Sequence, residues 1–119
     1  MQGFRELKLW KKSHELTLEI YRVSKSFPRQ EQYGITNQLR RASSSVAANL
    51  AEGCVRGGDA EFARFAQIAL GSASETEYFL LLARDLGFLN SQDYGDLETK
   101  VTEVKRMLTS LIHTLKGNR

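Results

Sequence analysis

The chain has 119 residues and a formal net charge of +3, so it suits one domain and is too weakly basic to indicate nucleic-acid binding by charge alone. No apolar run approaches the ~20 residues of a membrane span, and the first residues lack the apolar core of a signal peptide. A single cysteine, Cys54, excludes an internal disulfide framework and favours a reducing compartment. We therefore expect one cytoplasmic domain over residues 1–119.

The first predicted helix covers residues 7–26 and stops before Pro28, the only proline. Its inward stripe, at helical spacing, comprises Leu9, Leu16, Ile20, Val23 and Phe27. Residues 1–29 hold seven Lys or Arg against three acids, a charge of +4. Most of these basic side chains fall off the stripe: Lys8, Lys11, Lys12, Arg22 and Lys25. They form either a solvated helix face or a surface that attracts anions.

The second predicted helix covers residues 35–53 and has an inward stripe of mostly small residues, which lets a neighbouring helix approach closely. The stripe comprises Leu39, Ala42, Val46, Leu50 and Gly53. The helix is apolar or small over more than half its circumference, so we expect it to pack on several neighbours, including other subunits. Asn49 lies beside the stripe and needs specific hydrogen-bond partners if it is buried. Gly53 is expected as a left-handed cap.

The third predicted helix covers residues 59–87, with Asp59 as its N-cap and Gly87 as its C-terminal cap. Its seam is also made mostly of small residues: Phe62, Ala66, Ala69, Ala73, Thr76, Leu80 and Ala83. Gly71 costs about 1 kcal/mol relative to alanine in a helix interior, so we expect a close helix contact there.

The fourth predicted helix covers residues 91–116 and is capped by Asn90 or Ser91. Its stripe alternates steps of four and three: Leu97, Val101, Val104, Leu108, Leu111 and Leu115. No segment is typical of a strand. Four such helices joined by short turns favour an all-α, up-down-up-down antiparallel four-helix bundle.

The residue patterns of common metal and catalytic sites are missing from the sequence. A carboxylate-bridged di-iron site in a bundle needs Glu-x-x-His pairs, and neither His14 nor His113 has a glutamate three residues before it. No phosphate-cradling glycine motif and no nucleophile elbow is present. We therefore predict no enzyme activity, no metal, no cofactor and no small-molecule substrate.

A group of polar residues on the second and third helices has two interpretations. Its members are Arg40, Arg41, Asn49, Glu52 and Glu75. In one interpretation Glu75 meets an arginine of the second helix, and the ion pair fixes the register of the two helices. In the other, the arginines are exposed to phosphate.

The segment 38–53 resembles the signature of the four-helix-bundle proteins encoded in intervening sequences of bacterial 23S ribosomal RNA genes. The matching residues are Gln38, Leu39, Arg40, Ala42, Ser45, Val46, Asn49, Leu50, Ala51, Glu52 and Gly53. The chain is similar, more distantly, to the accessory proteins of diversity-generating retroelements. The resemblance implies a four-helix bundle that assembles as a homopentamer, and its genomic setting implies a nucleic-acid partner.

Two functional hypotheses follow. The first is an accessory protein that binds RNA or DNA through backbone phosphates. Its candidate contacts are Lys8, Lys11, Lys12, Arg22, Lys25, Arg40 and Arg41. The alternative is an oligomeric protein–protein interaction scaffold with no nucleic-acid role. Clustering of the basic side chains on one surface would favour the first hypothesis, and neutralisation of them by acids would favour the second.

Overall fold

The computed structural model describes residues 3–117, and its elements match the predicted helices closely. In chain order they are η1 (Phe4–Glu6), α1 (Lys8–Ser24), η2 (Arg29–Glu31), α2 (Ile35–Cys54), α3 (Asp59–Asp85) and α4 (Ser91–Leu115). Each long helix begins and ends within two residues of its predicted bounds. The described residues include no strand, so the all-α prediction is confirmed.

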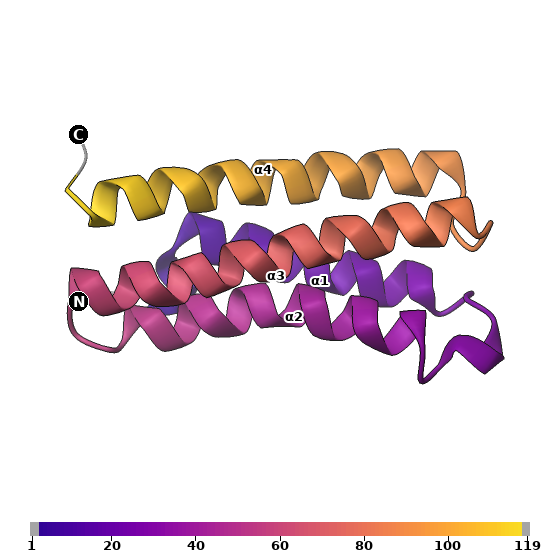
Figure 1. The fold of residues 1–119 in the computed structure, drawn as a ribbon, viewed down its shortest axis with the longest axis horizontal. Coiled ribbons are helices and arrows are strands. Elements are labelled where there is room, and N and C mark those ends of the chain that lie inside the picture. Colours follow the sequence, from indigo (N-terminus) through magenta and orange to yellow (C-terminus); the bar gives the residue numbers. More distant parts are fainter. Residues whose placement is uncertain (1–2, 118–119) are drawn as a thin grey trace.

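The four long helices lie side by side, and the turns between them fall at alternate ends of the molecule (Figure 1). Consecutive helices therefore run in opposite directions. Within the described chain, α1 packs on α2 and α4, and α3 packs on the same two helices, whereas no Cα atom of α1 lies within 8 Å of a Cα atom of α3. The helices thus occupy the corners of a square, with α1 diagonally opposite α3.

The core is formed by the apolar stripes that the spacing predicts. Fully buried residues come from every helix: Leu16, Ile20, Leu39, Val46, Leu50, Leu80, Leu97, Val101, Val104 and Leu108. The last turns of α4 differ from the prediction, because Ile112 is buried while Leu111 and Leu115 are only partly buried. An α-helix has 3.6 residues per turn, so a strict seven-residue pattern drifts around the helix over its length. That drift moves Ile112 inward.

The approach of α2 to α3 depends on Gly53, which is not the left-handed cap we expected. Gly53 is a buried residue inside α2, and positive φ angles occur elsewhere. A Cβ atom added there would lie 2.7 Å from Cβ of Phe65 and 3.1 Å from Cδ1 of Phe62. Glycine is therefore required at this position for helix contact rather than for backbone conformation.

The corner between α3 and α4 is closed as predicted. Gly87 has a φ of 80°. Its N–H donates to the carbonyl of Arg84 at 3.0 Å, and the N–H of Phe88 donates to the carbonyl of Ala83 at 2.9 Å. These two bonds form a Schellman motif, which satisfies carbonyls at the helix end. Asn90 then caps α4, because its side chain accepts a hydrogen bond from the following turn.

Two predictions at α3 are wrong. Asp59 is the first helical residue, and the N-cap is Gly58. Glycine leaves the first N–H groups without a side-chain partner, and Asp59 sits where the helix dipole favours an acid. Gly71 is exposed, and no atom would lie within 4 Å of a Cβ added there. Within one chain, no close contact explains this glycine.

Candidate functional site

Acids neutralise part of the basic surface of α1. The Nζ atom of Lys12 lies 3.2 Å from Oε1 of Glu103 on α4. Arg22 donates to Glu19 one turn earlier and lies 4.0 Å from Asp93 at the start of α4. The hydrogen bond from Arg22 is the main reason that the pKa of Glu19 is lowered. Lys12 therefore links α1 to α4. Arg22 pairs with an acid one turn earlier in α1 and lies close to an acid of α4.

The other lysines of α1 remain open to solvent. Lys8, Lys11 and Lys25 are exposed and have no acidic partner among residues 3–117. Lys11 and Lys25 lie fourteen positions apart on the outer side of α1, or about 21 Å at the rise of an α-helix. Lys8 and Lys11 are one turn apart at the start of α1, whereas Lys25 directly follows its last residue, so the three do not form one dense basic cluster.

Arg40 does not project freely from α2, because it is fixed against α1. Its Nε atom donates to Oγ of Ser24 at 2.8 Å, and Nη2 donates to the carbonyl of Tyr21 at 3.4 Å. Its guanidinium also lies 4.6 Å from the centroid of the Tyr21 ring. Arg41 is exposed and lines a small hollow with Glu75, yet the described chain has no ion pair between them. The expected register-fixing pair between α2 and α3 is therefore missing.

Serine side chains supply a polar link between α2 and α3 that was not predicted from the sequence. Asn49 donates to the carbonyl of Ser45 at 2.8 Å and to its Oγ at 3.0 Å. Oγ of Ser72 on α3 lies 3.0 Å from Oγ of Ser45. Asn49 thus has the specific partners it needs, while Glu52 pairs with Arg56 in the following turn. The feature of the sequence that could have predicted this contact is the small size of both serines, which lets two helices approach until the hydroxyl groups meet.

Large apolar side chains are exposed on α1 and α3, and also at Tyr33 and Val55 in the turns on either side of α2. On α3 these are Ile68 and Tyr78, with exposed fractions of 43% and 55%, and Leu86, which follows the last residue of α3, is 52% exposed. On α1 they are Leu18 at 56% and Tyr21 at 40%. In the part of the chain that the structure describes, α4 has no exposed large apolar residue. The outer face of α4 is therefore a solvated surface, whereas α1 and α3 are not fully covered.

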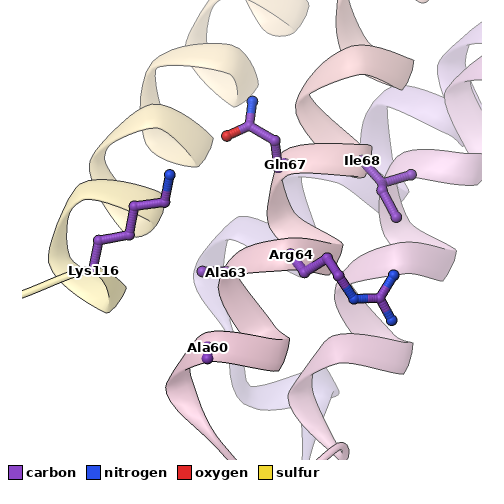
Figure 2. A pocket seen from close by; sticks show the side chains of 6 residues that line it. All are labelled: Ala60, Ala63, Arg64, Gln67, Ile68 and Lys116. Atoms are coloured by element: carbon purple, nitrogen blue, oxygen red, sulfur yellow. The ribbon is translucent and has the colours of Figure 1, made fainter.

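The surface hollow between the start of α3 and the end of α4 has no converging polar groups (Figure 2). Arg64 and Ile68 point to one side of α3, whereas Lys116 extends from α4 on the other side. Gln67 and two alanines complete the lining. None of these lining residues is a nucleophile paired with a base, which is the arrangement that nucleophilic catalysis needs.

The two histidines are not placed for metal binding. His14 is exposed and its ring stacks on Trp10, with 4.9 Å between centroids, and His113 is exposed near the end of α4. Across residues 3–117, no three His, Cys, Asp or Glu side chains gather in a group that could hold a metal ion. No helix there is long and apolar enough to cross a membrane. The absence of catalysis and of a metal remains a prediction.

Comparison with known proteins explains the pattern of α2. Residues 5–110 match the family described as 23S rRNA-intervening sequence protein. The chain belongs to this family. As a 23S rRNA-intervening sequence protein, it is similar in fold to a crystal structure from Bacteroides thetaiotaomicron, a protein of unknown function from the S23 ribosomal protein family. The two share 28% identity and a TM-score of 0.78, over 87% of this chain and 97% of that one. No curated protein matches the chain.

The segment that carries the resemblance to 23S rRNA-intervening sequence proteins lies within α2. Most of its apolar positions are buried between α2 and its neighbours, as Leu39, Val46 and Leu50 show. Its polar residues Ser45 and Asn49 form the link toward α3. The pattern therefore records mainly how α2 packs, and it identifies the fold more directly than it identifies an activity.

Proposed function

We propose that this protein is a non-enzymatic, self-associating helical module, whose copies join through the apolar surfaces of α1 and α3. The observation that carries the proposal is the uneven distribution of exposed apolar side chains, present on α1 and α3 and absent from the described α4. Such patches mark interfaces in soluble proteins. The single cysteine favours a cytoplasmic setting.

The two surfaces differ in shape, which supports contact between unlike faces. On α3, Tyr78, Leu82 and Leu86 follow one another at steps of four, so bulky side chains form a line along the helix. The second surface includes the outer side of α2 as well as α1, and there Ala48 is exposed and Ala51 is partly buried. Small residues on one copy leave room for bulky residues on another, as close helix packing requires.

An interface between unlike faces leads to a ring. Because α1 and α3 are diagonally opposite, one copy can use its α3 surface while its α1–α2 surface contacts a third copy. Such heterologous contacts form a closed ring when the rotation from one copy to the next divides a full turn into equal parts. The homopentamer implied by the family resemblance is an assembly of this type.

Light scattering on the purified protein tests the proposal. We expect wild type at micromolar concentration to have several times the 13.5 kDa mass of one chain. Replacing Tyr78 and Leu86 together with glutamate should give a helical monomer, because two charges would be buried in the contact. Thr109→Glu, on the exposed side of α4, is the matched control and should keep the wild-type mass. A monomeric wild type would overturn the proposal.

Binding of RNA or DNA through backbone phosphates is the second candidate function. It is favoured by Lys8, Lys11 and Lys25, which are exposed and lack acidic partners in the described chain. A ring would repeat these charges, and repeated weak contacts reinforce one another through effective concentration. Arg40 and the paired Lys12 have fewer free donors to offer.

A salt titration with labelled RNA and DNA tests this candidate. Replacing Lys8, Lys11 and Lys25 with glutamine should weaken binding to both polymers and flatten the dependence of affinity on salt, because fewer counterions are released. Lys12→Gln removes a charge that Glu103 already offsets, so it should have a smaller effect. If wild type binds neither polymer at low salt, the protein-interaction function stands alone.

A further inference from the structure

A surface hollow of about 280 Å³ opens where α1 turns into α2. Three cationic side chains line it, Lys25, Arg29 and Arg40, and no carboxylate is among the lining residues. Phe27 and Pro28 supply an apolar part of the wall. Several positive charges around one concave site, without a lining acid, favour an anionic ligand.

Arg40 is held in position at this hollow and keeps unused donors. Its bonds to Ser24 and Tyr21 engage Nε and Nη2, and the Tyr21 ring supports the guanidinium plane. A guanidinium has five N–H donors, and the rest of them have no acceptor among residues 3–117. A fixed, planar arginine recognises oxyanions better than a mobile lysine does.

Thr36 adds a buried hydroxyl that has no partner. The residue lines the hollow and is 7% exposed, and its Oγ1 makes no hydrogen bond within the described chain. Other helical threonines, such as Thr17 and Thr76, donate to the carbonyl four residues back, at 3.1 Å and 2.8 Å. Thr36 is the second residue of α2, so residue Gln32 lies outside the helix. A ligand oxygen that met this hydroxyl after a small shift of the lining side chains would supply the missing hydrogen bond.

The start of α2 supplies further donors. Its N-cap is Gly34, which has no side chain to bond the first N–H groups of the helix. These groups form the positive end of the helix dipole and favour an anion. Oε1 of Glu31 lies 2.8 Å from the position of a Cβ on Gly34, and Glu31 does not line the hollow.

We propose that this hollow binds one phosphate group, either free or as the monoester of a small molecule. The donors lie on α1, on the turn and on α2, and the oxygens of a phosphate point in enough directions to meet donors from three sides. The apolar wall at Phe27 and Pro28 leaves a place for the group that carries the phosphate. The hollow shares Lys25 with the candidate nucleic-acid contacts, and Tyr21, which supports Arg40, also belongs to the exposed surface of α1. The test below therefore measures binding of a small phosphate, which neither self-association nor contact to a polymer backbone requires.

Calorimetric titration of the full chain tests the site with three probes: inorganic phosphate, adenosine monophosphate and adenosine. The ionic strength is held constant with sodium chloride. We expect saturable binding of both phosphate-containing probes and none of adenosine. Arg29→Gln should weaken phosphate binding roughly three- to tenfold through loss of a charge-assisted contact. Thr36→Val, which has nearly the same shape, should weaken it for lack of the hydroxyl.

Arg41→Gln is the matched control, because Arg41 is exposed on the same helix and lines a different hollow. It should leave the affinity for phosphate within about twofold of wild type, since an exposed charge outside the hollow is screened by salt. Equal weakening by Arg41→Gln and Arg29→Gln would mean diffuse attraction and would overturn the proposal. Binding of adenosine equal to that of its monophosphate, or no saturable phosphate binding, would overturn it too. Lys25→Gln gives a second variant if Arg29→Gln folds poorly.

Discussion

A pair of glycine-to-alanine substitutions measures how tightly α2 packs on α3. Both Gly53 and Gly71 lie inside helices, where alanine is favoured by about 1 kcal/mol. At Gly71 the new methyl group meets nothing within 4 Å, so Gly71→Ala should stabilise the fold by up to about that amount. At Gly53 it would lie 2.7 Å from Cβ of Phe65, an atom that moves only with the backbone.

The steric cost at Gly53 is that of overpacking a core, about 1–3 kcal/mol. Because both variants share the helix-propensity gain, which is smaller in the last turn, the difference between them reports mainly this cost. We expect Gly53→Ala to unfold at a lower urea concentration than Gly71→Ala. The free energy of unfolding, extrapolated to water, should be lower by about 1–3 kcal/mol. Equal stability would refute the tight α2–α3 contact. A destabilised Gly71→Ala would instead show that another copy packs closely there.

Three further substitutions test single contacts. Asn90→Ala removes the side-chain acceptor for the N–H of Asp93 and should cost about 1 kcal/mol in urea unfolding, whereas an unchanged midpoint would contradict the cap. Thr36→Val should raise stability in phosphate-free buffer by about 1 kcal/mol, and a loss would mean that the hydroxyl has a partner. Arg22 lowers the pKa of Glu19 in the folded protein. The contribution of this pair to stability is therefore present above the ordinary pKa of a glutamate and is lost as pH falls through the lowered pKa of the folded state. Glu19→Gln should slightly reduce the acid sensitivity of thermal unfolding, and an unaltered pH dependence would count against the pairing.

Helix positions and most of the core could be predicted from the sequence, because apolar spacing and end signals act locally. The stripe around Leu50 is buried as expected, and Gly87 and Asn90 close the corner that their residue types favour. Gly53 and Gly71 could not be told apart by spacing. One faces a phenylalanine and the other faces solvent, and this depends on which helix lies opposite.

The candidate sites were less predictable, since long polar side chains choose partners across helices. Arg40 was expected near the acids of α3 or facing solvent, and it is bound to α1 instead. The hollow at Thr36 has no sequence motif, because its donors come from a helix end, a turn and a helix start. Family membership adds the fold of a relative, which is described as a protein of unknown function.

The square arrangement of the helices also bears on how the chain refolds. Three of the four helix contacts join neighbours in sequence, and only the contact of α1 with α4 bridges the first and last helices. Chains dominated by local contacts fold within about microseconds to milliseconds. We expect the helical hairpins to form early and the α1–α4 contact to close last. Amide protons of α1 should therefore exchange with solvent sooner than those in the middle of α2 and α3.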